Sequence, residues 1–265
     1  MITIKSPSEF AKMRVAGATV AAVHQAVRDA AEPGVTTGRL DALAAKVIEE
    51  RGCTPSFLGY YGYPSSICAS PNSVIVHGIP GDYVLREGDL ISVDVGAVYE
   101  GYHGDAAISF GVGDLSLDVE RLLITTEEAM WAGLAQAVPG NRVGDIGAAV
   151  EAIGTAAGYG VVREYVGHGI GKRMHEEPQI PNHGKAGKGM KLRTGMALCV
   201  EPMFNLGTHE TAVLDDEWTV VTADGSTSCH WEHTIALTED GPQVFTLPDG
   251  AEVGLDALLA ARALS

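Results

Sequence analysis

Two segments that lie far apart in the sequence resemble each other closely. Residues 85–94 read LREGDLISVD and residues 192–201 read LRTGMALCVE, so that leucine, arginine, glycine and valine coincide and Asp94 corresponds to Glu201. Each segment is typical of a turn followed by a core strand that ends on an acid. Because a buried carboxylate without a partner is costly, each acid must either face water or meet a positive charge.

The sequence before each segment predicts a pair of helices. SPSE at residues 6–9 is typical of a helix start, because Ser6 can cap the helix and Glu9 can return the hydrogen bond. Apolar residues then recur at helical spacing up to Pro33-Gly34. Further helices are expected over residues 37–51, 116–137 and 143–157, with strands and loops over 53–112 and 161–247.

The boundaries of the two helix pairs repeat as well. The residues that match at one offset are Pro33 and Pro139, Gly34 and Gly140, Gly38 and Gly144, and Gly52 and Gly158. Such punctuation is common at helix ends, but together with the matching strands it favours an ancestral duplication. The order of elements predicts an α+β fold of two pseudo-symmetric halves. We expect a single domain over 1–265, with halves of roughly 1–112 and 113–247 and a short closing helix over 253–264.

A hairpin places a second acid beside Asp94. Glu100-Gly101 is typical of a turn between two strands, across which even-numbered residues pair with odd-numbered ones. Asp94 and Asp105 are therefore expected to point to the same face. In the second half Glu201 ends one strand and Glu232 lies on the strand after the TADGS turn, so that Glu232 corresponds to Asp105.

Four carboxylates that converge on one centre cannot all stay ionised near neutral pH without positive charge nearby. Two divalent cations would cancel their four charges. The alternative places each acid on a solvated strand face, and for a single acid that alternative is favoured. Four acids at duplicated positions in apolar strands favour a metal site. His168 is a fifth candidate ligand, because the glycines on both sides leave its imidazole unobstructed.

Composition limits the other classes of function. The chain has 265 residues, 46% of them hydrophobic, and a net charge of −16, which is far from the basic footprint of a nucleic-acid binder. The basic segment at 185–193 is better explained as a solvated glycine-rich loop. No apolar run approaches the ~20 residues that span a membrane, and the first residues, MITIKSPSEF, lack a signal-peptide core. Four scattered cysteines then indicate a cytoplasmic protein with reduced thiols.

Taken together, these motifs resemble the type I methionine aminopeptidases, which have the pita-bread fold, a central antiparallel sheet covered by helices. The most specific part is YVGHGIG at 165–171, followed by His175, Ile180 and Asn182, and the likeness covers essentially the whole chain. HGIP, DVG, HGD, EPM and WEHT match as well. Ala106 and Met174 depart from residues that are frequent in the family, threonine and phenylalanine, but neither change removes a ligand.

The resemblance implies a centre of two divalent metal ions (cobalt, manganese, iron or zinc). Asp94 would chelate one ion, His168 and Glu201 would hold the other, and Asp105 and Glu232 would bridge both. Glu201 is our candidate for moving the proton of the attacking water. His77 and His175 would hydrogen-bond the scissile carbonyl and amide; the alternative for each histidine is a hydrogen bond within a loop.

Specificity for an unbranched side chain needs an apolar pocket. Aromatic residues in strands usually belong to a core, but the resemblance implies a methionine pocket. The residues that it places there are Phe57, Tyr60, Tyr63, Cys68, His77, His175 and Trp218.

The leading hypothesis is a hydrolase that removes initiator methionine from peptides and nascent chains. We expect a cytoplasmic monomer that binds chain N-termini but no nucleic acid and no membrane, with the ribosome as a candidate partner. An Xaa-Pro aminopeptidase or prolidase on the same fold is the enzymatic alternative, but such enzymes carry a large N-terminal domain, for which we expect no room before Ser6. A non-catalytic binding protein of this fold should have lost ligands, and all five are present. The motifs HExxH, GxSxG and GK[ST] are absent.

Overall fold

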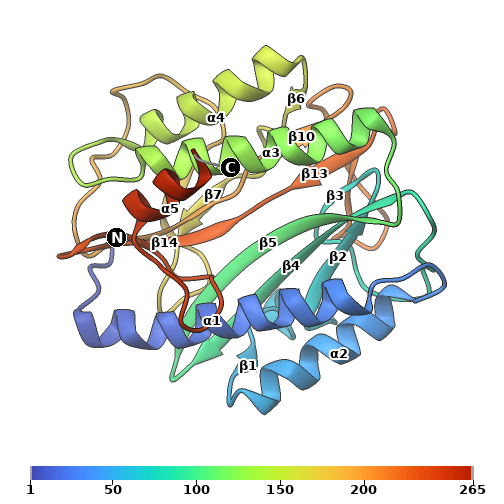
Figure 1. The fold of residues 1–265 in the computed structure, drawn as a ribbon, viewed down its shortest axis with the longest axis horizontal. Helices are drawn as coiled ribbons and strands as arrows, with labels where there is room; N and C mark the ends of the chain where they lie inside the picture. Colours follow the sequence, from blue (N-terminus) through green and yellow to red (C-terminus); the bar gives the residue numbers. More distant parts are fainter. Residues whose placement is uncertain (1, 264–265) are drawn as a thin grey trace.

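The computed structural model of the chain describes residues 2–263. Two pairs of helices lie on the outside, α1 and α2 on one side and α3 and α4 on the other, and antiparallel strands fill the space between them (Figure 1). The main core lies between these layers and includes Val23, Leu40, Val93, Met130 and Val200, all fully buried. This is the helix-covered antiparallel arrangement that the sequence predicts.

The first pair of helices begins as the sequence indicates. α1 (Pro7–Ala30) starts with a capping box, in which the Glu9 N–H donates to Ser6 Oγ at 3.4 Å and the Ser6 N–H donates to Glu9 Oε2 at 2.8 Å. α2 (Thr37–Glu50) is capped by the Thr36 hydroxyl and buries Leu40, Ala44 and Ile48 at helical spacing. Both helices pack against the strands of the first half.

The strands of the first half form a four-stranded sheet, a hairpin of two long strands with two short strands added along one of them. β4 (Asp89–Tyr99) pairs with β5 (Tyr102–Val112) across the turn at Glu100 and Gly101, both of which have positive φ. The two short strands, β1 (Thr54–Pro55) and β2 (Ile67–Pro71), pair with the other edge of β4. The expectation that the strand ends at Asp94 is wrong. β4 continues to Tyr99, because the residues after Asp94 keep pairing with β5 as far as Tyr102.

The second half repeats the helix pair with α3 (Leu117–Gln136) and α4 (Val143–Ala157), and α4 ends at Gly158 with positive φ. Its main sheet has the order β15-β14-β9-β7-β8. The bounds of these strands are β7 (Gly167–Gly169), β8 (Glu176–Ile180), β9 (Ala197–Val200), β14 (His233–Thr238) and β15 (Gly241–Val244).

Short elements complete the described chain. They are β1 (Thr54–Pro55), the 3-10 helix η1 (Tyr60–Gly62), β3 (Val74–Val76), β6 (Gly160–Val161), β10 (Met203–Asn205), β11 (Thr211–Val213), β12 (Val220–Thr222), β13 (Ser228–His230) and α5 (Leu255–Arg262). α5 lies where the closing helix was expected, although residue 264 of that expectation is outside the described residues. Within residues 2–263, none of the helices has the length and apolar character needed to cross a bilayer.

The two halves meet along β5 and the residues that lead into β14. The Glu232 N–H donates to the Ala107 carbonyl at 2.8 Å, and the Ala107 N–H donates to the Glu232 carbonyl at 3.3 Å. The Thr234 hydroxyl donates to the Asp105 carbonyl at 2.7 Å. This seam between the halves brings acids from both copies of the duplication to the centre of the molecule.

Candidate metal centre

The register of the first hairpin fixes the positions of its two acids. Asp94 pairs with Ala107, and Asp105 pairs with Gly96 two residues further along β4. Because side chains alternate along a strand, Asp94 and Asp105 share one face, which confirms the expected pairing of even with odd residues. Glu201 directly follows β9 and Glu232 directly precedes β14, so the second half supplies its acids at the ends of two paired strands.

His168 reaches the same place from β7. Its Nδ1 donates to the Gly169 carbonyl at 2.9 Å, which leaves Nε2 free. Nε2 lies 3.7 Å from Asp105 Oδ2 and 3.6 Å from Glu201 Oε1. The flanking glycines allow this approach, because a Cβ at Gly167 would lie only 2.3 Å from the Cys199 carbonyl oxygen. The structure thus brings the imidazole between acids of both halves.

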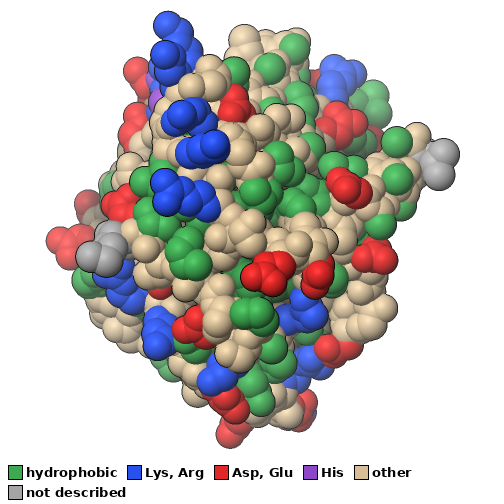
Figure 2. Space-filling model, turned by 90° about the vertical axis from the view of Figure 1, so that its left-hand side faces the viewer, with side chains coloured by type: hydrophobic (Ala, Val, Ile, Leu, Met, Phe, Trp, Pro, Cys, Tyr) green, Lys and Arg blue, Asp and Glu red, His purple; other side chains and the backbone are tan. Residues whose placement is uncertain are grey.

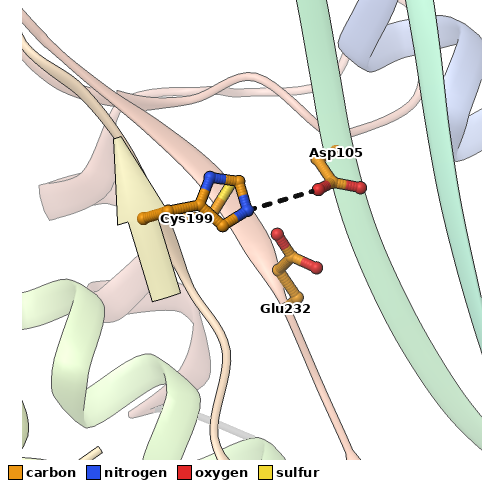
Figure 3. Close-up of side chains that lie close together, drawn as sticks. Asp105, Cys199 and Glu232 are labelled. Atoms are coloured by element: carbon orange, nitrogen blue, oxygen red, sulfur yellow. Dashed lines mark ion pairs between the residues drawn. The ribbon is translucent and has the colours of Figure 1, made fainter. Parts of the chain in front are cut away.

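Several carboxylate oxygens of this cluster are buried without any hydrogen-bond partner. They are Asp94 Oδ1, Asp105 Oδ1 and Glu232 Oε1. Figure 3 shows the carboxylates of Asp105 and Glu232, one on β5 and the other before β14, directed into the same space. Since a buried polar atom without a partner costs about 1–3 kcal/mol, three such atoms at one point indicate a ligand that they bind.

Burial dominates the electrostatics of the centre. It raises the pKa of Asp94, Glu201 and Glu232 well above the ordinary range, and the neighbouring acids raise it further. Burial also raises the pKa of Asp105, to about 7. The pKa of His168 is lowered to about 4, again chiefly by burial, so its imidazole is neutral at pH 7 and suited to bind a metal ion. Without a cation these acids can be accommodated only by binding protons.

The donor atoms fall into two overlapping groups. In each group the donor atoms all lie within 4.8 Å of one another; the first group is Asp105, His168, Cys199 and Glu232, and the second is Glu201, His230 and Glu232. Cys199 Sγ lies 3.6 Å from the Thr234 hydroxyl, and burial raises the pKa of its thiol well above the usual value, so we assign the thiol to that contact and not to a metal ion. Asp94 belongs to neither group, although it lines the same cavity. The other donor groups are carboxylates and imidazoles, a set that fits manganese, iron, cobalt or zinc.

The carboxylate–imidazole cluster lines a cavity of about 140 Å³. All seven residues expected to form the methionine pocket line it, together with Met174, whose departure from the family pattern was expected to affect the pocket wall. These residues are Phe57, Tyr60, Tyr63, Cys68, His77, His175, Trp218 and Met174. Cys68 lines it because it pairs directly with Asp94 across β2 and β4. The aromatic side chains therefore form a pocket wall as well as a small core.

The two candidate catalytic histidines lie at the same cavity. The His175 ring lies 4.3 Å from the His168 ring, and its Nδ1 lies 2.7 Å from the Tyr60 hydroxyl. His77 has a φ of 60° and packs edge-on against Trp218, with ring centroids 6.3 Å apart. Burial lowers the pKa of both histidines to about 4. Both are therefore neutral at pH 7.

Two features of the site escape the sequence analysis. The first is a buried ion pair, in which Lys5 Nζ donates to Glu176 Oε2 at 2.9 Å and so ties the N-terminal segment to the residue after His175. The second is His230, whose Nε2 lies 3.9 Å from Glu201 Oε2. His230 could have been identified, because it precedes Glu232 by two residues and so shares its face if the backbone is extended.

Solved structures with the same architecture identify the fold. A methionine aminopeptidase from Thermotoga maritima superimposes with a TM-score of 0.91 at 42% identity, covering 93% of this chain and 100% of that one. A prolidase from Pyrococcus furiosus has a TM-score of 0.76 at 21% identity, covering 93% of this chain and 66% of that one, and shows the fold alone. Fold and centre together define a metallopeptidase of the pita-bread type, an enzyme that uses divalent metal ions.

Sequence comparison then gives the family. The model of the metallopeptidase family M24 matches residues 11–239. Methionine aminopeptidase 1 of Mycobacterium tuberculosis is 53% identical over 251 residues, which cover 92% of this chain and 94% of the relative. The chain therefore belongs to the metallopeptidase family M24 and, within it, to the type I methionine aminopeptidases.

Proposed function

We propose that this chain removes the initiator methionine from nascent proteins and peptides by metal-dependent hydrolysis of the first peptide bond. The observation that carries the proposal is the small aromatic cavity that the carboxylate–imidazole cluster lines. A chain end inserted there would place its first side chain against the aromatic wall and its first peptide bond beside the acids. The name shared by the relatives supports methionine as that side chain.

Two peptides test this function and its enzymatic alternative. We expect the enzyme to cleave Met-Ala-Ser after methionine and to leave Ala-Pro-type peptides intact. The reason is that the small aromatic cavity suits an unbranched apolar first side chain. Product formation is measured by chromatography, with the metal content determined on the same sample. Faster cleavage of the proline peptide would support the Xaa-Pro peptidase instead, and cleavage of neither by the metal-loaded protein would support a binding protein.

We propose that the centre holds two divalent ions, with Asp94, Asp105, His168, Glu201 and Glu232 as ligands. The unpartnered buried oxygens and the neutral imidazole support this set. Ions bound there would make hydroxide available near pH 7 and polarise the carbonyl under attack. They would also take the free α-amine, which only a chain end offers.

The side chains around the centre would position the substrate and move protons. Burial raises the pKa of Tyr60, so its phenol stays protonated and can donate to His175 Nδ1. A neutral His175 then carries its proton on Nε2, and this N–H can donate a hydrogen bond to the scissile carbonyl. We assign a similar hydrogen bond, to the substrate backbone, to His77. Glu201 is placed to take the proton of the attacking water and pass it to the leaving amine.

Replacing His168 by alanine is expected to weaken metal loading by at least tenfold, because it removes the imidazole held 3.6 Å from Glu201 and 3.7 Å from Asp105. The measurement is a titration of the metal-free variant with cobalt followed by calorimetry. His183→Ala, at a partly exposed position in the loop after β8, is the matched control. Unchanged stoichiometry and affinity in the His168 variant would exclude it as a ligand.

Metal affinity is expected to rise with pH. The folded metal-free protein keeps protons on its buried acids, because the pKa of Asp105 is about 7 and those of the other three are raised. The raised pKa of Asp105 stabilises the metal-free fold at low pH, and that stabilisation is lost as pH rises through about 7; the raised pKa values of the other three acids act in the same direction. A metal ion must displace these protons when it binds. Each displaced proton lowers the apparent metal affinity by about tenfold for every pH unit below the pKa of its acid.

Melting temperatures with and without cobalt test this pH dependence. The stabilisation by metal should be larger at pH 8 than at pH 6, and calorimetry in buffers of different ionisation enthalpy should show protons released on binding. A metal effect that is equal at both pH values would contradict the assignment of protonated acids.

We also propose that the protein is a single-domain cytoplasmic monomer whose partners are nascent chains presented by the ribosome. Four free cysteines support a reducing compartment. On the face shown in Figure 2, apolar side chains are interspersed with charged and polar ones, and a row of lysine and arginine side chains runs along its upper left. That mixture of side chains makes this face a poor candidate for an extended subunit interface.

A further inference from the structure

We propose that His230 is a second imidazole ligand of the centre, and that it binds through Nε2 an ion shared with Glu201 and Glu232. The inference rests on the proposed metal site and extends its ligand set beyond the four acids and His168. The ion would belong to the metals that favour imidazole, namely iron, cobalt or zinc.

The geometry of His230 matches that of a ligand. Its donor nitrogen and one oxygen each of Glu201 and Glu232 all lie within 4.8 Å of one another. The distance from His230 Nε2 to Glu201 Oε2 is 3.9 Å, too long for a hydrogen bond. Two atoms that each lie about 2.1 Å from one ion are separated by about 3 to 4.2 Å. The gap between these two atoms therefore has the width that a shared ion requires.

The two histidines lie beside different oxygens of Glu201. His168 Nε2 lies 3.6 Å from Oε1, and His230 Nε2 lies 3.9 Å from Oε2. Glu232 belongs to both groups of donor atoms. Each ion of a dinuclear centre could thus bind one imidazole, with Glu232 between them.

A merely structural role does not account for His230. Its side chain is 2% exposed, and its Nε2 is buried without a hydrogen-bond partner. Other buried histidines use a ring nitrogen in a hydrogen bond: His24 Nε2 lies 3.1 Å from the Val93 carbonyl, and His233 Nδ1 lies 2.8 Å from Thr246 Oγ1. A buried polar atom without a partner needs an explanation, and an ion at the acids provides one.

His230→Gln tests the proposal, with His24→Gln as the control for loss of a buried imidazole that bonds the Val93 carbonyl and does not line the cavity. Metal-free wild type and both variants are titrated with cobalt by calorimetry, and the visible absorption of the cobalt protein is recorded. We expect the His230 variant to lose at least tenfold in affinity at one site and to change its cobalt spectrum, and the His24 variant to match wild type. Affinities within twofold of wild type and an unchanged spectrum would overturn the proposal.

X-ray absorption by the zinc- or cobalt-loaded wild type tests the same proposal without any variant, should His230→Gln fail to fold. Two imidazoles per fully loaded centre are expected, and a single imidazole would refute the role of His230. The outcomes also separate this inference from the proposed function. An active, metal-dependent enzyme with one imidazole contradicts only His230, whereas a wild type that binds no divalent ion contradicts both.

Discussion

Exhaustive chelation of the purified enzyme is expected to abolish its peptidase activity, with a loss of at least ~10³-fold, and cobalt, manganese or iron should restore it. The contribution of a metal ion to transition-state stabilisation is several kcal/mol, and each 1.4 kcal/mol is a factor of ten in rate. When the ion is absent, burial keeps the surrounding acids at least partly protonated, and neutral acids do not supply the positive charge that would polarise the carbonyl.

The measurement is the rate of Met-Ala-Ser cleavage before chelation, after removal of the chelator, and after addition of each metal. Circular dichroism on the same samples shows that the fold survives, so that lost activity reports lost metal. Full activity in protein whose metal content is below a few per cent of the enzyme concentration would rule out the metal mechanism.

Glu201→Gln is expected to lower kcat by roughly 10² to 10⁴-fold, the range for loss of a general acid–base group. Glutamine keeps the size of the side chain and one oxygen, but it neither accepts a proton nor carries the charge that helps to hold the ion. Glu201 is suited to the proton transfer because its side chain is 13% exposed, the most open of the acids within reach of His168.

Steady-state kinetics at saturating metal separates the two roles of Glu201. A fall in kcat that persists when the metal content equals that of wild type reports proton transfer, whereas a fall that excess metal reverses reports ligation alone. Glu210→Gln, at an exposed position away from the cavity, is the control. Near-normal turnover by the Glu201 variant would remove this residue as the proton carrier.

The features that the sequence predicts well are those set by local chemistry. The capping box at Ser6 and Glu9, the turn at Glu100-Gly101 and the shared face of Asp94 and Asp105 follow from neighbouring residues and from strand alternation. The predicted end of the strand at Asp94 is wrong. An acid after an apolar run is typical of a strand end, but β4 carries Asp94 in the middle of the strand.

The features that the sequence does not predict depend on packing between distant segments. The pairing of Ala107 with Glu232 decides which side chains reach the centre, and it connects halves whose contact no local pattern specifies. The approach of His230 to Glu201 and the burial of Lys5 against Glu176 are consequences of that packing. Periodicity along one strand could suggest that His230 faces the same way as Glu232, but not which acid it would meet.

A metal ion bound at the proposed centre would have a second role at the seam between the halves. Asp105 and His168 come from opposite halves, so an ion bound by both would add a cross-link to the backbone hydrogen bonds at Ala107 and Glu232 and to the pairing of β3 with β12. Anything that binds only the assembled state stabilises it in proportion to occupancy. Slower amide exchange along β5 and β14 should therefore accompany metal uptake, and protease should cut the metal-loaded protein more slowly than the metal-free protein.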